Sequence, residues 1–184
     1  MPHRLDAQSA DFEAAFTAFL TAKRDAEEDV AQVVSAVVAD VRARGDAALL
    51  DYTRRFDRVT LTASELRVSD AVLDDAADAC PPETRDALAF AARRIEAHHE
   101  RLRPTDLDHR DPAGLRVGHR WTPVASAGLY VPGGTAAYPS SVLMNALPAK
   151  VAGVEELIMV VPTPGGELNE LVLAAAHICG VDKV

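Results

Sequence analysis

The last third of the chain is almost free of charge, and this feature limits its fold more than any other. Residues 124–184 carry only seven of the 47 charged side chains of the 184-residue sequence, and residues 1–123 carry the other 40. A segment so poor in charge must be covered on more than one side, as strands and helices are in the layers of an α/β sheet. We therefore predict a mainly helical region, 1–123, followed by an α/β region, 124–184.

The order of apolar runs in the second region indicates a parallel sheet. We predict strands at 125–131 and 155–162, helices at 141–153 and 163–180, and the opening of a third strand at 181–184. Right-handed crossovers turn this β-α-β-α-β order into a Rossmann-like sheet with helices packed on it. The sheet is incomplete, so we expect a truncated chain or one completed by another polypeptide.

The first region has a helical pattern. A capping-box-like pair, Asp25 and Glu28, precedes five valines on one helical face, which we expect to be core, and Gly45 ends the helix. These valines are Val30, Val33, Val34, Val37 and Val41. Further helices are predicted at 46–57, 70–80 and 83–102, a loop with a possible short strand at 60–68, a turn at 105–113 and a strand at 115–121.

Charge and hydropathy exclude several classes of protein. A net charge of −9 and an isoelectric point near 5.1 argue against nucleic-acid binding, which favours a basic surface. No apolar run has the length of a signal peptide or a membrane span, so we expect a cytoplasmic protein with no membrane partner. Cys80 and Cys179 stand alone, which predicts small buried side chains rather than a disulfide framework or a zinc finger.

The segment 128–153 places a strand, a glycine loop and a helix start in the order in which α/β folds build ligand sites. Gly133 and Gly134 allow a tight turn or a close ligand, Pro132 stiffens the loop, and Tyr130 offers a ring and a hydroxyl to a nucleotide. Ser140 or Ser141 is expected to cap the helix. The loop is not a GxGxxG fingerprint, and a structural turn explains a lone PGG equally well.

Other polar residues near this loop have two readings each. Asn145 and Lys150 could each bind a ligand. Alternatively, Asn145 is an amide whose hydrogen bonds are satisfied within the protein, and Lys150 is an edge lysine whose aliphatic stem is buried. Pro148 removes a helix donor and is expected to kink or split its helix. His99 is expected to be a core histidine and His98 to face solvent.

Nothing in the sequence identifies a catalytic or metal-binding group. His109, His119 and His177 have no second His, Cys or carboxylate at a spacing that would bind a metal. No Ser/His/Asp or Cys/His arrangement is legible, and Cys179 has no neighbouring base that would lower its pKa. We assign no catalytic residue and no metal ligand in this chain.

The block RWTPVASAGLYVPGGTAAYPSSVLMNALPAKVAGVEELIMVVPTP closely resembles the signature of the histidinol dehydrogenase family, and RRFD, LRVS and IEAHHERL extend the resemblance more loosely upstream. The resemblance implies the N-terminal part of a cytoplasmic homodimeric enzyme that oxidises L-histidinol to L-histidine through the aldehyde with two NAD and a zinc ion. It implies that Tyr130 contributes to the NAD site and that Pro132, Gly133 and Gly134 shape it. The zinc ligands and the Glu-His pair of the family would lie beyond residue 184.

Three hypotheses follow. The chain is an inactive N-terminal fragment of histidinol dehydrogenase, or it is a stand-alone α/β binding or assembly module that pairs through an exposed sheet edge. The third is a glycine-loop enzyme of different chemistry, which the missing catalytic arrangements disfavour. One departure from the family is that His99 is followed three residues later by Leu102, where the family often has glutamine. The roles of His99 and Cys179 stay open at this point.

Overall fold

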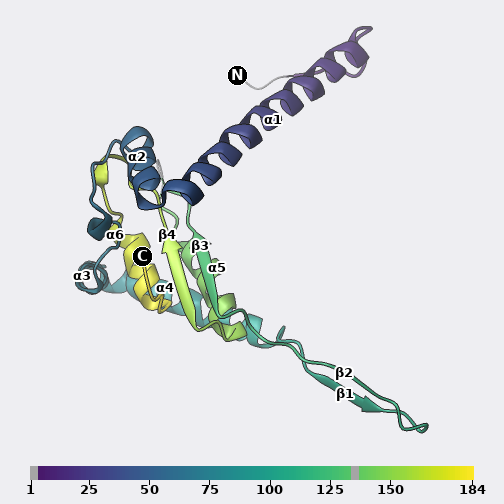
Figure 1. Ribbon diagram of the computed structural model, residues 1–184, viewed down its shortest axis with the longest axis vertical. Helices are drawn as coiled ribbons and strands as arrows, with labels where there is room; N and C mark the ends of the chain where they lie inside the picture. Colours follow the sequence, from purple (N-terminus) through teal and green to yellow (C-terminus); the bar gives the residue numbers. More distant parts are fainter. Residues whose placement is uncertain (1–3, 134–136) are drawn as a thin grey trace. The chain divides into compact units, whose positions relative to one another are not determined.

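The computed structural model describes residues 4–133 and 137–184, without the side chains of residues 22–29. Two compact units make up the chain, residues 1–52 and residues 53–184 (Figure 1). The elements are α1 (Phe12–Arg44), α2 (Asp46–Phe56), the 3-10 helix η1 (Ala63–Glu65), α3 (Asp70–Ala79), α4 (Pro82–Glu100), β1 (Leu107–Arg110), β2 (Arg116–His119), β3 (Ser126–Tyr130), α5 (Pro139–Ala152), β4 (Glu156–Val160), the 3-10 helix η2 (Pro164–Gly166) and α6 (Glu170–Ile178). The mixed helix and sheet content confirms the predicted α/β class.

The first unit holds the long helix α1 and the start of α2. Helix α1 begins at Phe12, so the predicted start at Asp25 was wrong, and it ends at Gly45 as predicted. The predicted core face is also wrong, because Val30 and Val33 are 62% and 61% exposed. A valine stripe shows which face of a helix is apolar but not whether another element covers it, and only Val37 and Val41, near the end of α1, are partly buried.

The second unit is built around a short parallel sheet. Strands β3 and β4 pair in parallel from Ser126 opposite Glu156 to Tyr130 opposite Val160. The predicted third strand is present as a parallel bridge between Ile158 and Lys183. The Met159 N–H donates to the Lys183 carbonyl at 2.8 Å, which ties this segment to β4. The order β3, β4, then 181–184 matches the predicted β-α-β-α-β topology.

One face of the sheet carries the main core. Leu129 and Val131, like Leu157 and Met159, point toward α5 and α6. All four side chains are at most 8% exposed. Helix α4 packs against α5 and α6, and α3 packs against α6. Alternation along the strands sends Tyr130, Ile158 and Val160 to the opposite face, where they are exposed. The sheet is therefore apolar on both faces but covered within this unit on one.

Helix α5 is continuous through Pro148, so of the two predicted outcomes, a kink or a split, the split is wrong. The donor that proline lacks would have reached the carbonyl of Met144, whose side chain is 59% exposed, and Ala146 and Leu147 beside it are buried in the core. Packing on one side and solvent access on the other let the helix continue. It ends at Gly153, whose φ of 91° is the left-handed conformation that favours glycine.

Two ion pairs and a side-chain hydrogen bond fasten the third strand to the end of α5 and to the start of β4. The Asp182 carboxylate accepts the Leu157 N–H at 2.8 Å and the Lys150 ammonium at 3.0 Å. These two donors, the backbone N–H first, hold the pKa of Asp182 below its usual value. Lys183 donates to Glu156 at 2.6 Å on the same strand pair. These contacts fix the register of the third strand against the start of β4.

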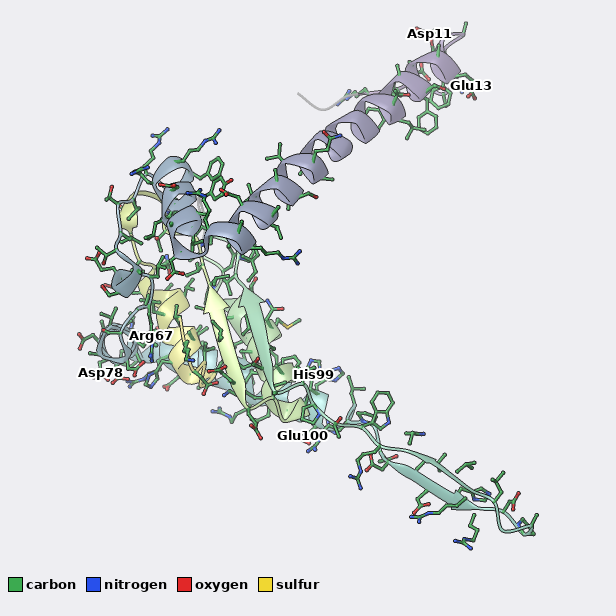
Figure 2. The ribbon with its side chains drawn as sticks, viewed as in Figure 1. Asp11, Glu13, Arg67, Asp78, His99 and Glu100 are labelled. Carbon is green, nitrogen blue, oxygen red and sulfur yellow. The ribbon has the colours of Figure 1, made fainter. Side chains whose placement is uncertain are left out.

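Strands β1 and β2 form an antiparallel hairpin, with Leu107 opposite His119 and Arg110 opposite Arg116. Strand β2 was predicted, but β1 falls where a turn was expected. The bidentate contact of Arg116 with Asp108, at 2.7 and 2.6 Å, joins the two strands. Figure 2 shows His99 and Glu100 at the end of α4, shortly before the chain enters this hairpin.

The boundary between compact units does not coincide with the composition boundary at Pro123. Helices α3 and α4 precede Pro123 yet pack on α5 and α6, which follow it. The division into functional domains 1–123 and 124–184 stays a prediction. Predicted helices at 46–57, 70–80 and 83–102 are confirmed as α2, α3 and α4. The segment 60–68 contains η1, which begins with a capping box between Thr62 and Glu65, instead of the possible strand.

Candidate functional site

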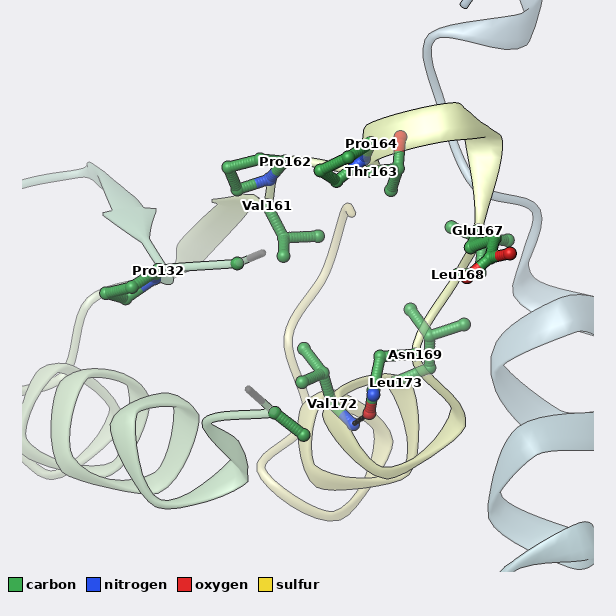
Figure 3. Close-up of a pocket in the computed structure, with 12 residues that line it drawn as sticks. Pro132, Val161, Pro162, Thr163, Pro164, Glu167, Leu168, Asn169, Val172 and Leu173 are labelled. Atoms are coloured by element: carbon green, nitrogen blue, oxygen red, sulfur yellow. Dashed lines mark hydrogen bonds between the residues drawn. The ribbon is translucent and has the colours of Figure 1, made fainter. Parts of the chain in front are cut away.

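A pocket of about 420 Å³ opens where β3 and β4 end. Its wall consists of the loop after β3, the loop after β4 and the first turn of α6. Figure 3 shows the proline-containing loop after β4 on one side of the pocket and the start of α6 facing it. The lining residues are Pro132, Gly133, Ala137, Val161, Pro162, Thr163, Pro164, Glu167, Leu168, Asn169, Val172 and Leu173. The carboxyl ends of parallel strands are where α/β folds bind their ligands, and the volume is in the range of small-molecule sites.

The two strand-end loops touch at Gly133. A Cβ at this position would lie 2.7 Å from the carbonyl oxygen of Pro162 and 3.2 Å from its Cδ. Only glycine lets the two backbones approach so closely. The Val131 N–H, which donates to the Val160 carbonyl at 3.0 Å, holds the strands together just before this contact. Gly133 thus closes one end of the pocket.

A second Pro-Gly-Gly turn, Pro164–Gly166, follows β4 inside the segment 163–180 for which a helix was predicted, so the predicted start of that helix is wrong. Gly165 and Gly166 have φ angles of 70° and 81°, which are left-handed and suit glycine. The Gly165 N–H donates to the Asp57 carbonyl at 2.9 Å, and the Gly166 N–H donates to Thr163 at 2.8 Å. The turn is therefore anchored, and the chain leaves it along the pocket. The repetition of PGG after two successive strands was the signal that could have revealed it.

The polar side chains of the pocket all come from the segment between β4 and α6. They are the side chains of Thr163, Glu167 and Asn169. Asn169 caps α6, because its Oδ1 accepts the Val172 N–H at 3.2 Å. No lysine or arginine belongs to the lining of the pocket in the described part of the chain. The site consequently combines apolar walls with a helix N-terminus, an amide and a single carboxylate, which suits hydroxyl-bearing ligands better than a bare phosphate.

The structure brings together only part of the predicted site. Pro132 and Gly133 line the pocket, and Gly134 lies outside the described residues. Tyr130 does not line the pocket, because strand alternation sends its ring to the open face of the sheet, where it is 62% exposed. Helix α5 begins at Pro139 with Tyr138 at the cap position, so the expected cap by Ser140 or Ser141 is wrong.

The contacts and burial of the other candidate residues do not place them in the pocket. Lys150 pairs with Asp182, which favours its structural reading, and Asn145 is exposed away from the pocket lining. His98 is exposed as predicted, but His99 is half-buried and not part of the core, so its predicted core position is wrong. Burial raises the pKa of the Cys179 thiol to about 11, so it is no activated nucleophile. Among the described side chains, which leave out residues 1–3, 22–29 and 134–136, no three His, Cys, Asp or Glu residues are grouped as a metal site would need.

Comparisons with known proteins agree in one family. The family profile described as histidinol dehydrogenase matches residues 20–184. The histidinol dehydrogenase of Rhodospirillum rubrum is 61% identical over 184 residues, which is 100% of this chain and 42% of that protein. The one of Bradyrhizobium diazoefficiens is 59% identical over 184 residues, with 100% and 43% covered. This chain therefore spans less than half the length of these relatives.

A solved structure has the same fold. The crystal structure of histidinol dehydrogenase from Elizabethkingia anophelis matches 83% of this chain and 35% of that chain, with a TM-score of 0.73 and 29% sequence identity. No helix in the described part of this chain is both long and apolar enough to cross a membrane.

Proposed function

Because the chain belongs to the histidinol dehydrogenase family, we propose that it forms the NAD side of an enzyme that oxidises L-histidinol to L-histidine through the aldehyde. One observation carries the proposal: the pocket at the carboxyl ends of β3 and β4, closed by the contact of Gly133 with Pro162. A dinucleotide binds at this edge of a Rossmann-like sheet, where glycine loops and helix N-termini face the ligand.

The chemistry of the pocket fits a dinucleotide. Pro132 and Gly133 on one loop and Pro162 on the other offer flat apolar walls for a base or a ribose. Asn169 and Thr163 add polar side chains that exchange hydrogen bonds with ribose or amide groups. We also propose, from the matched family motif, that Gly134 shapes this site and that Tyr130 contributes to it from the open face of the sheet. NAD would supply the hydride acceptor, and these residues would bind and orient it.

Zinc does not fit the described residues. They contain no group of three or more possible ligands, and a catalytic zinc site needs three protein ligands. We propose that the zinc ligands and the acid-base groups of the enzyme lie in parts of the longer protein that this chain does not include. The 184-residue chain alone is then expected to bind NAD without oxidising histidinol.

Binding and turnover of the 184-residue chain test the proposal separately. Isothermal titration calorimetry should detect NAD binding, and L-histidinol in the same cell serves as the ligand expected not to bind. NADH formation from NAD and L-histidinol, with zinc added, should stay at the level of a blank. Turnover together with one zinc per chain by metal analysis would overturn the assignment of catalysis to other parts of the protein. Absence of NAD binding by a folded chain would overturn the cofactor role.

A second candidate function, a binding or assembly module, rests on the uncovered sheet face. Tyr130 and Val160 are 62% and 57% exposed, and β3 pairs with β4 alone among the described strands. Parallel sheets are normally covered on both faces. We further propose that the complete protein is a cytoplasmic homodimer. Sedimentation equilibrium of this chain is the discriminating measurement, because a monomer with a two-state melt would show that the face needs no partner.

A further inference from the structure

Arg58 has a strained backbone conformation close to the pocket. It is the single non-glycine residue with a positive φ, 60°, in the part of the chain that the structure describes. Crowding of the Cβ atom makes this left-handed conformation unfavourable for residues other than glycine and, less strongly, asparagine or aspartate. The Arg58 side chain is exposed, and with the described residues it forms no hydrogen bond or ion pair. The neighbouring main-chain contacts must therefore hold the backbone in this conformation.

The carbonyl that precedes Arg58 supports the second PGG turn. The Asp57 N–H donates to the Thr53 carbonyl at 2.9 Å at the end of α2, and the Asp57 carbonyl accepts the Gly165 N–H, also at 2.9 Å. Gly165 follows Pro164, which lines the pocket. The φ angle of Arg58 is the rotation that sets the Asp57–Arg58 peptide against the chain that follows. It thereby sets where the Asp57 carbonyl lies relative to Val59.

Val59 contacts the same turn from the other side of Arg58. A Cβ added at Gly166 would lie 3.8 and 3.9 Å from the two Cγ atoms of Val59, which is ordinary van der Waals distance. Residues 57–59 thus hold the second PGG turn at two points, a main-chain hydrogen bond and an apolar contact. Both contacts can form together only while Arg58 keeps its left-handed φ.

We propose that Arg58 is a positioning residue, whose left-handed backbone holds residues 163–168, one wall of the pocket, in the shape that binds NAD. The inference rests on the proposed NAD function of this pocket. Residues 57–59 act from outside, since among the described residues that line the pocket none belongs to this segment. The requirement at position 58 is tolerance of a positive φ, and the guanidinium contributes nothing to it.

Three substitutions separate the backbone from the side chain. Arg58→Val, Arg58→Gly and Arg58→Asn all remove the guanidinium, but glycine and asparagine accept a left-handed φ and the β-branched valine does not. The glycine and asparagine variants are therefore matched controls for the valine variant. NAD is titrated calorimetrically into the native chain and each variant. NMR measures the scalar coupling across the hydrogen bond from the Gly165 N–H to the Asp57 carbonyl, and the bond from the Val131 N–H to the Val160 carbonyl, 3.0 Å long, is the internal reference.

Arg58→Val should lose the Gly165 coupling, keep the Val131 coupling and bind NAD about tenfold more weakly than the native chain. Arg58→Gly and Arg58→Asn should keep both couplings and an affinity within about threefold of the native value. An equal loss of affinity in all three variants, or a Gly165 coupling that persists in Arg58→Val, would overturn the positioning role and leave the proposed function intact. Loss of both couplings in Arg58→Val would mean general unfolding and would also overturn the role. Absence of NAD binding in the folded native chain would overturn both the role and the proposed function.

Discussion

The contact between Gly133 and Pro162 gives a sharp test of how the pocket is built. In Gly133→Ala the new Cβ would meet the Pro162 carbonyl oxygen at 2.7 Å, where ordinary contact begins at 3.4 Å. The two loops must separate by about 0.7 Å, and overpacking of this kind costs about 1–3 kcal/mol of the free energy of unfolding. The neighbouring bond from the Val131 N–H to the Val160 carbonyl, 3.0 Å long, limits how far they can move.

The matched control is Gly128→Ala in the middle of β3, where an added Cβ has no heavy atom within 4 Å. Urea unfolding followed by circular dichroism should give a lower midpoint with an unchanged slope for Gly133→Ala, and no loss for Gly128→Ala. NAD titration should show weaker binding only for Gly133→Ala. Equal midpoints and equal NAD affinities for the two variants would refute the close approach of the two loops.

Three further outcomes are expected. Asp182→Asn replaces an ionised acceptor of two donors at the base of the sheet and should lower the free energy of unfolding by about 1 kcal/mol at pH 7, discounted for partial exposure. Because the pKa of Asp182 is lower in the folded chain, the unfolded chain binds more protons in acid. The native protein should lose this stability as the pH falls below about 4. In urea titrations at several pH values, the free energy of unfolding of the variant should therefore fall less with acid than that of the native protein. Leu157→Ala, at a fully buried position, should cost about 2–5 kcal/mol, and Val33→Ala, on the exposed face of α1, less than about 0.5 kcal/mol in the same assay. Cys179, with its raised pKa and 5% exposure, should react with a thiol reagent at pH 8 only as urea unfolds the chain; rapid labelling of the native protein would contradict its burial.

Periodicity and breakers predicted the elements that carry the fold. Pro81 and Pro82 set the boundary between α3 and α4, and continuous apolar runs marked β3 and β4. Charge depletion after Pro123 correctly indicated an α/β arrangement, although within this unit the sheet is covered on one face only. The valine face of α1 was misread because a local pattern reports amphipathicity, and burial depends on which elements pack against it.

The site was only half visible in the sequence. The first PGG turn, 132–134, was recognised from the sequence. The second, 164–166, was predicted to be part of a helix, because the apolar run after it dominates the pattern. Tyr130 was chosen for its chemistry, and the period of two, with buried Leu129 before it, already placed it on the other face of the strand. Strand β1 was hidden by Asp and Pro residues, because its pairing with β2 is a non-local contact that turn propensity does not report.

The fastening of the sheet at one end has a consequence for its motions. One ion pair and several hydrogen bonds join β4 to residues 182 and 183 at the start of the strand, whereas the pocket end is held by the Val131–Val160 hydrogen bond, glycine turns and one close contact. Local opening should therefore follow a gradient along β4, and amide hydrogens at Leu157 and Met159 should exchange more slowly than those of residues 163–168. A ligand that enters the pocket can then rearrange the loops while the strand register stays fixed.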